Sequence, residues 1–297
     1  MLMTPTPLAW LEPLLERAAA LANDTTPVVA PAEVYLGIDL GTSDVVSMAV
    51  DAQGTPLAVC LDWADVVRDG VVLNFVEAVR IVRRQIAQIE SLLKRRFTHA
   101  ATSFPPGTDP RISANVIEAA GLQVSEIIDE PTAVARLLGI AHGAVVDIGG
   151  GTTGVAVIDK GQVVYSGDEA TGGHHVTLCL AGALKTSIEA AQDFKHQRGL
   201  EAWPIVRPVF EKMTDIVRAH LGSYRSSDHE AHLEAYHGAH FKAPLPLSTL
   251  YLSGGSCALP GVQALFAEAF PGVEVFLPQP CLFLTPLAIA ASARGAA

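Results

Sequence analysis

The stretch "VVDIGGGTTGVAVID", residues 145–159, decides the fold. An apolar run ends in Asp147, three glycines and two threonines follow, and a second apolar run begins. Glycine lets a backbone turn sharply and approach a ligand closely, because no Cβ stands in the way. An acid at a strand tip followed by such a turn indicates a hairpin that presents backbone N–H groups beside a carboxylate.

An earlier stretch, "LGIDLGTSDVVSMAVD" at residues 36–51, repeats this pattern with Asp39, Gly41, Thr42 and Ser43. Two such units at corresponding places predict an internal duplication. Two similar α/β subdomains would face each other, and each would offer one hairpin to the cleft between them. Neither unit is a Walker A loop, which needs the pattern GxxxxGK[ST]. Neither is a dinucleotide-binding fingerprint, because a strand follows each turn where that motif has a helix.

The residue types in these hairpins suit a polyphosphate. Backbone N–H groups at glycine turns can surround an anion, and side-chain hydroxyls add donors. The hydroxyls come from Thr42, Ser43, Thr152 and Thr153. A polyphosphate brings a cation, and Mg²⁺ prefers oxygen ligands and keeps several waters, which suits Asp39 and Asp147 at the strand tips. One of these acids could also orient a water that attacks phosphorus.

Two further features lie between or after the hairpins. Gly254, Gly255 and Ser256 follow a strand and precede a helix, where the backbone could lie flat against a nucleoside. An ordinary helix start is the alternative. Glu130, just before Pro131, is a third acid between the halves. Its alternative role is to complement the dipole at a helix N-terminus.

Composition excludes several classes of protein. The chain has 297 residues, with 49% hydrophobic and 17% charged, so a large core is expected and disorder is not. The net charge of -11 argues against a nucleic-acid partner. We see no signal peptide and no apolar stretch of the ~18 residues that span a bilayer, so we expect a cytoplasmic protein. The four cysteines form no CxxC pair, which favours free thiols.

The pattern divides the chain into three parts. Residues 1–33 form an amphipathic helix and a linker, residues 34–143 the first subdomain, and residues 144–280 the second. A C-terminal helix at residues 281–294 completes the first subdomain. Within the second, helices are predicted at 174–198 and 204–221.

The N-terminal helix carries an apolar stripe: Leu8, Leu11, Leu15, Ala18 and Ala22. One hypothesis is a docking helix, which the linker at 23–33 leaves free to bind a partner. The alternative is a tail that packs on its own domain. A polar insert further along carries His229, His232, His237 and His240. It is either a solvated loop or a transition-metal site.

Four stretches together resemble a known superfamily. "GIDLGTSD", "DEPTAVA", "DIGGGTTG" and "LSGGS" resemble, in this order, the phosphate-1, connect-1, phosphate-2 and adenosine motifs. These motifs define the actin-like, or ribonuclease H-like, ATPase fold of actin and DnaK, which sugar kinases and division and pilus ATPases share. "TPLAIAASA" resembles the connect-2 helix. A narrower resemblance, through "AVCLDWADVVRDGVV", "THAATSFPPGTDPRISANV" and "DEATGGHHVTLCLAG", is to the chaperone-like EutJ family of bacterial ethanolamine utilisation.

The resemblance implies ATP and Mg²⁺ as cofactors and assigns a role to each matched residue. Asp39 and Asp147 would hold the metal, and Asp147 and Glu130 would act on the attacking water. The nucleotide would contact Gly41, Thr42, Ser43, Gly149, Gly150, Gly151, Thr152, Thr153, Gly254, Gly255 and Ser256. "AAQDFK" resembles the helix that binds ribose and adenine, which adds Gln192 and Lys195. The chain departs from the pattern at Gly154, where relatives often carry an acid, and at Gln192, where they often carry Glu.

The function that follows from this resemblance is an ATP-binding, chaperone-like accessory protein with slow hydrolysis. Its partners would be ethanolamine-pathway enzymes or proteins of the bacterial microcompartment, with which the chain could associate. Two alternatives stay open: a nucleotide-bound scaffold like the division and pilus ATPases, and a small-molecule kinase of the same fold.

Overall fold

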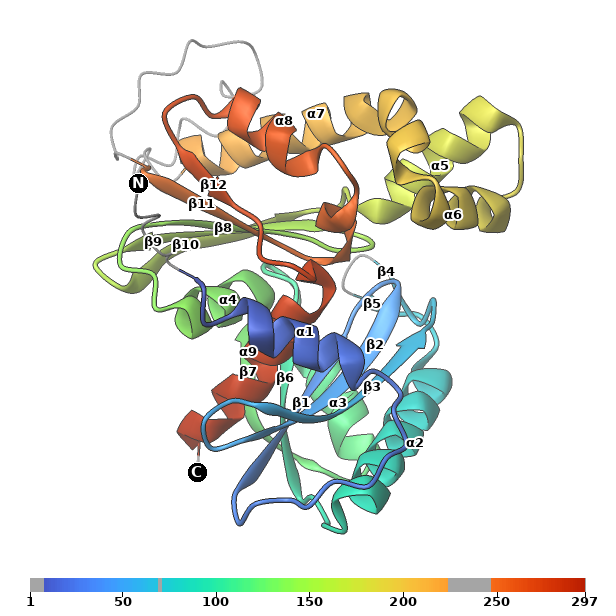
Figure 1. Ribbon diagram of the computed structural model, residues 1–297, viewed down its shortest axis with the longest axis vertical. Helices are drawn as coiled ribbons and strands as arrows, with labels where there is room; N and C mark the ends of the chain where they lie inside the picture. The colour runs from blue at the N-terminus through green and yellow to red at the C-terminus, as the bar shows by residue number, and fades with distance from the viewer. Residues whose placement is uncertain (1–7, 69–70, 224–246, 297) are drawn as a thin grey trace.

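A computed structural model describes residues 8–68, 71–223 and 247–296, and it contains two five-stranded sheets built on one plan (Figure 1). The strand order is β3-β2-β1-β6-β7 in the first sheet and β10-β9-β8-β11-β12 in the second. In each sheet, three strands form an antiparallel meander and two further strands pair in parallel. The duplicated α/β architecture expected from the two hairpins is confirmed.

The elements of the first half are α1 (Glu12–Ala20), β1 (Val34–Leu40), β2 (Asp44–Asp51), β3 (Pro56–Trp63), β4 (Val67–Arg68), β5 (Val71–Val72), α2 (Phe75–Leu93), β6 (His99–Phe104), α3 (Arg111–Ala119), β7 (Gln123–Asp129) and α4 (Glu130–Leu138). Those of the second half are β8 (Gly143–Ile148), β9 (Thr153–Asp159), β10 (Gln162–Glu169), α5 (Gly173–Leu184), α6 (Ile188–Gln197), α7 (Gly199–Ser223), β11 (Thr249–Ser253), η2 (Gly255–Ala258), α8 (Val262–Ala269), β12 (Glu274–Phe276), η3 (Cys281–Phe283), α9 (Leu284–Ser292) and η4 (Ala293–Ala296).

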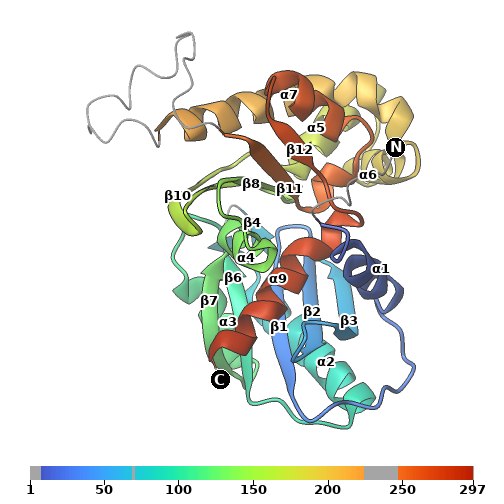
Figure 2. The same ribbon diagram turned by 60° about the vertical axis from the view of Figure 1, so that its left-hand side comes forward.

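Three apolar layers hold these elements together. One lies between the first sheet and α2 and α3, and another between the second sheet and α5, α7 and α8. The third lies between the two sheets and is filled by α1, α4 and α9 (Figure 2). Strands covered on both faces are expected to be almost continuously apolar. This explains the burial of every residue from Gly143 to Ile148 in β8.

The C-terminal helix α9 packs on the first sheet, although it follows the second in the chain. At its closest point, a Cβ added to Gly37 of β1 would lie 2.4 Å from the backbone nitrogen of Ala290. Only glycine leaves room for this approach. The helix therefore lies in the layer that joins the two halves of the molecule.

The hypothesis of a free N-terminal docking helix is wrong. Leu11, Leu15 and Ala18 are fully buried between the sheets, where α1 packs against β3, η3 and α9. The residues after the helix are not a free linker, because Asn23 bonds to Val59 and Leu61 through backbone and side chain, and the N–H of Val28 donates to Leu92. An amphipathic stripe shows that one face is buried but not what covers it.

The single helix predicted at 174–198 is two helices. Lys185 adopts a left-handed conformation that ends α5, and the hydroxyl of Ser187 accepts a hydrogen bond from Ala190 N (3.2 Å) that begins α6. The helix predicted at 204–221 begins earlier, at Gly199, so Pro204 lies inside it. The histidines at 229, 232, 237 and 240 lie outside the described residues.

In the described part of the chain, all four cysteines are free thiols, and Cys60, Cys257 and Cys281 are buried. The described helices include none that combines the length and the apolar character needed to cross a membrane.

We predict that Leu15→Ala lowers the free energy of unfolding by about 2–5 kcal/mol, because it leaves a cavity between the two sheets. Chemical denaturation measures this change. The matched control is Glu16→Ala on the exposed face of the same helix, which should stay within ~0.5 kcal/mol. Equal stability of both variants would contradict the burial of α1.

Candidate functional site

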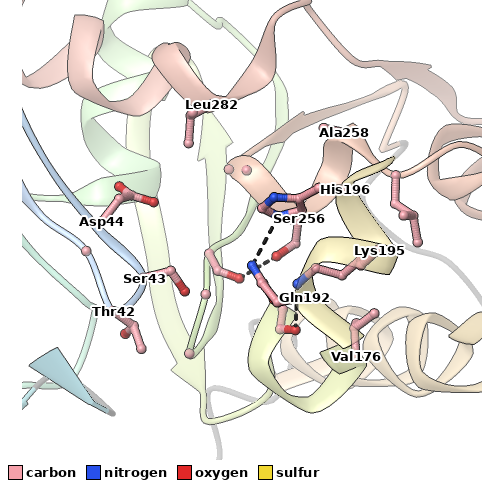
Figure 3. A pocket seen from close by; sticks show the side chains of 18 of the residues that line it. Thr42, Ser43, Asp44, Val176, Gln192, Lys195, His196, Ser256, Ala258 and Leu282 are labelled. Atoms are coloured by element: carbon pink, nitrogen blue, oxygen red, sulfur yellow. Dashed lines mark hydrogen bonds between the residues drawn. The ribbon is translucent and has the colours of Figure 1, made fainter. Parts of the chain in front are cut away.

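The two glycine hairpins meet at one side of a cavity of about 700 Å³. A Cβ added to Gly150 would lie 2.0 Å from Ser43 Oγ, and one added to Gly151 would lie 2.6 Å from Thr42 Oγ1. Figure 3 shows Thr42, Ser43 and Asp44 on one side of this pocket and residues of the second half on the other. The glycines are therefore required for the contact between the halves as well as for a turn.

The backbone of the second hairpin is oriented by bonds to its carbonyl groups. Gly149 O accepts from Gly173 N (2.9 Å) and from Ser256 Oγ (2.7 Å), and Gly150 O accepts from His174 N (2.7 Å). These bonds turn the carbonyls toward α5 and η2. Among the described residues, the N–H groups of Gly150 and Gly151 donate no hydrogen bond. Such free amides in a glycine turn form an anion-binding concavity.

Four acids line the same cavity: Asp39, Asp44, Glu130 and Asp147. Asp39 accepts a hydrogen bond from Ser103 Oγ (3.0 Å), and Asp147 accepts one from Thr285 Oγ1 (2.5 Å). Asp39 lies next to the end of β1 and Asp44 begins β2. Glu130 begins α4 and Asp147 lies in β8, so four separate elements supply these carboxylates.

Burial raises the pKa of each of these acids. For Asp39 the pKa rises to about 8, with further contributions from the charges of Asp44 and Asp147. For Asp44 it rises to about 6, through burial and then Asp147. The pKa of Glu130 is raised well above its usual value by burial and then by Asp39 and Asp147. Burial also raises the pKa of Asp147, which the bond from Thr285 partly offsets.

The donor set fits Mg²⁺, because all the acids offer hard oxygen ligands and their repulsion would be relieved by a divalent cation. Within the described ranges, no three side chains of His, Cys, Asp or Glu lie close enough together to hold one metal ion. A cation here would therefore be held largely through its own waters, which Mg²⁺ usually retains. Asp39 and Asp147 are the residues that would bind those waters.

Strand β9, which pairs with the strand that carries Asp147, lacks a side chain beside these acids. The register pairs Asp147 with Gly154 and Gly154 with Asp168, so the three positions form a row on one face. A Cβ on Gly154 would lie 3.4 Å from Asp168 Oδ1 and 3.5 Å from Pro131 Cδ. A carboxylate from β10 therefore lies next to the position at which the resemblance led us to expect an acid.

The other end of the cavity is formed by α5, α6 and η2. Lys195 Nζ donates to Thr177 Oγ1 (2.8 Å) and Gly173 O (3.2 Å), and burial lowers its pKa to about 8. Thr177 Oγ1 donates in turn to Gln192 Oε1 (2.6 Å). Gly254 has φ +88°, and a Cβ there would lie 2.3 Å from Asp147 Oδ1. This glycine turn therefore packs directly behind the acids.

The comparisons with known proteins agree with this geometry. The sequence model for the cell division protein FtsA matches residues 144–293, and the one for the MreB/Mbl protein matches residues 61–188. The ethanolamine utilization protein EutJ of Escherichia coli (strain K12) is 55% identical over 285 residues, which cover 96% of this chain and 95% of that protein. The protein of the same name from Salmonella typhimurium is 54% identical over 288 residues, or 97% and 95%.

The chain belongs to the EutJ family.

Solved structures support the same assignment. The crystal structure of EutJ from Carboxydothermus hydrogenoformans has a TM-score of 0.82 and 38% identity, and the match covers 96% of this chain and 99% of that chain. MreB5 of Spiroplasma citri, crystallised bound to ADP, has a TM-score of 0.65 at 15% identity over 86% and 95% of the two chains, which shows the fold alone. The resemblance to the EutJ family and the actin-like ATPase fold are both confirmed.

In this member of the EutJ family, the cavity brings together nearly all the residues selected from the sequence. They are Asp39, Gly41, Thr42, Ser43, Glu130, Asp147, Gly149, Gly150, Gly151, Thr152, Gln192, Lys195, Gly254, Gly255 and Ser256. Thr153 does not line it. Its side chain is fully buried, and its hydroxyl donates to Thr171 O (2.6 Å) instead.

The sequence analysis missed several residues that line the cavity. Asp44 directly follows the first glycine turn, and its position after Ser43 was a usable signal. Trp63 and Thr285 lie within stretches used for the resemblance, and His196 directly follows one, but none of these stretches indicated that the side chain reaches the cavity. Thr285 comes from α9, far along the chain from Asp147.

We predict that the ligand-free protein loses stability as the pH rises from about 5 to 8. A carboxyl whose folded-state pKa is raised stabilises the fold below its unfolded pKa near 4, and this contribution is lost as the pH rises through the folded values of about 6 for Asp44 and about 8 for Asp39. Melting temperatures across this range measure the effect.

Asp39→Asn should flatten this pH dependence, because the amide cannot ionise. Asp51→Asn, on the opposite end of the same hairpin, is the matched control and should keep the wild-type slope. An identical slope in wild type and Asp39→Asn would contradict the role of the buried acids.

Proposed function

We propose that the chain binds ATP with Mg²⁺ in the cavity between its two halves. The observation that carries this proposal is the contact of the two glycine hairpins, which brings free backbone amides of Gly150 and Gly151 beside the hydroxyls of Thr42 and Ser43. Phosphate groups would lie against these donors. Magnesium supplies positive charge at the phosphates when it is bound.

We further propose that hydrolysis is slow. Glu130 and Asp147 line the cavity beside the hairpins and are the groups that could orient or deprotonate an attacking water. The raised pKa of Glu130 makes its carboxylate, when ionised, a stronger base than a solvated carboxylate. The missing side chain at Gly154 removes one group that could hold that water, so this site is less complete than the pattern it resembles.

The physiological role that we propose is that of a chaperone-like accessory protein in ethanolamine utilisation. Membership of the EutJ family supports the pathway, and the nucleotide cavity supports a role controlled by ATP. The partners would be pathway enzymes or microcompartment proteins. A pull-down of such partners by the ATP-bound and by the ADP-bound protein tests this role. Different amounts of partner in the two states would support it, and equal amounts would argue against it.

A second candidate is a scaffold that binds nucleotide without turnover, as in the division and pilus branch of the fold. The observation that favours it is Gly154, because the row Asp147–Gly154–Asp168 leaves the central position without a side chain. Binding without release of phosphate would support the scaffold. Slow release without any added acceptor would support the ATPase, and product formation only with an added acceptor would support the kinase alternative.

We predict that Gly150→Ala weakens Mg²⁺–ATP binding by at least about tenfold, because its Cβ would overlap Ser43 Oγ and separate the hairpins. Isothermal calorimetry measures the affinity. Gly182→Ala is the matched control, since no atom lies within 4 Å of its added Cβ and alanine favours the helix. No binding by folded wild-type protein would refute the proposed function.

We predict that Asp147→Asn keeps nucleotide affinity within about threefold but removes most of any hydrolysis, because the amide retains the acceptor for Thr285 and loses the charge. Phosphate release in a single-turnover assay measures the rate. Glu130→Gln should behave in the same way. Full turnover in both variants would show that the water is activated elsewhere.

A further inference from the structure

The lining of the cavity includes an aromatic contact between the two halves of the chain. Trp63, at the end of β3, lies with its ring centroid 5.8 Å from that of His196 on α6, at an interplanar angle of 49°. Both residues line the cavity. Trp63 is nevertheless 59% exposed, so much of the apolar surface of its indole ring is open to solvent.

The position of Trp63 depends on the first glycine hairpin. In the register of β2 and β3, Trp63 is the partner of Asp44. The N–H of Ala64 donates to Ser43 O (3.1 Å). The indole is therefore attached through two neighbouring contacts to the turn that faces Gly150. A ligand that binds its phosphates at this turn has its remaining part within reach of Trp63.

The lining of this end of the cavity includes apolar surface that suits a flat heterocycle. The apolar lining comes from Val176, Phe210, Ala258, Leu259 and Pro260. Burial and then the charge of Lys195 lower the pKa of His196, so its ring is neutral at neutral pH and can pack against an apolar face. The amide of Gln192 lies 3.1 Å from His196 Nε2 and supplies polar groups at one edge.

We propose that Trp63 is a nucleoside-binding residue, whose indole covers the outer face of the base of a purine nucleotide. The proposal rests on the proposed function, and it adds a contact from the first half of the chain to a base held mainly by the second half. A base inserted between two rings needs about 7 Å between them, twice the ~3.5 Å contact distance. The observed 5.8 Å is shorter, so the base lies beneath the pair, against Val176 and Ala258.

An indole is well suited to this role. It offers a large rigid surface with only two rotatable bonds, and stacking on a base does not depend on a particular pattern of hydrogen bonds. The contact would also form only when the halves are close, because Trp63 and His196 belong to different halves. Binding of the base and approach of the two halves would therefore favour each other.

The test separates the base from the phosphates by comparing ADP with inorganic pyrophosphate, each with Mg²⁺, on the full chain. Trp63→Ala should weaken ADP binding by about tenfold and leave pyrophosphate binding unchanged, because only ADP carries a base. Trp63→Phe keeps a ring and should stay within about threefold. Trp10→Ala is the matched control: it removes an indole that is 47% exposed and does not line the cavity, and it should bind both ligands like wild type.

Tryptophan fluorescence gives a second measurement that does not depend on affinity. ADP should change the emission of the wild-type protein and of Trp10→Phe much more than that of Trp63→Phe, which keeps Trp203 beside the cavity-lining Phe210. Pyrophosphate should cause a much smaller change. Melting temperatures check that each variant is folded, and Trp63→Leu, which is apolar without a ring, replaces the alanine variant if that one is destabilised.

Two results would overturn the inference while leaving the proposed function intact. One is wild-type ADP affinity in the alanine or leucine variant. The other is an equal loss of ADP and pyrophosphate binding, which would mean that Trp63 acts only by supporting the hairpin. A wild-type protein that binds neither ligand would refute the proposed function itself and this inference with it.

Discussion

The cleft depends on the absence of a Cβ atom at Gly150. Ser43 Oγ occupies the place where any residue other than glycine at position 150 would carry its side chain, and Thr42 stands in the same relation to Gly151. This contact joins turns from two different sheets, so it sets the distance between the halves at the site. Because the carbonyls of the second turn are already bonded to α5 and η2, its amides are the groups that the contact brings to the cavity.

The contact between hairpins needs the sheets to be held at a matching distance elsewhere. The layer of α1, α4 and α9 between the sheets sets this distance. The close approach of Ala290 to Gly37 shows that the packing in this layer is tight. The same layer reaches the site directly, since Thr285 of α9 donates to Asp147. A cation that competes for the oxygens of Asp147 would therefore weaken the hydrogen bond from Thr285 and alter a contact of α9, a helix of the layer that joins the halves.

The acids of the site explain why binding of a cation with a polyphosphate would be favourable. Four carboxyls share one cavity, and their raised pKa values express the unfavourable free energy of keeping them ionised without a counter-charge. A divalent cation relieves that repulsion. The row Asp147–Gly154–Asp168 adds a carboxylate from β10 beside the empty central position, which gives this member of the EutJ family a different arrangement from a site with an acid at residue 154.

The sequence by itself determined the fold class, the duplication and most of the lining of the cavity, because these depend on local signals: an acid at the end of an apolar run, and glycines where a backbone must turn. The break at Lys185 and the hydroxyl bond of Thr153 were not predicted, and the packing of the N-terminal stripe on its own domain was only one of two alternatives, since each depends on what lies opposite. Only the tertiary structure brought Thr285 to Asp147 and Trp63 to His196. Such contacts are set by the distance between elements packed on different sheets, and that distance cannot be predicted from the pattern of residues along the chain.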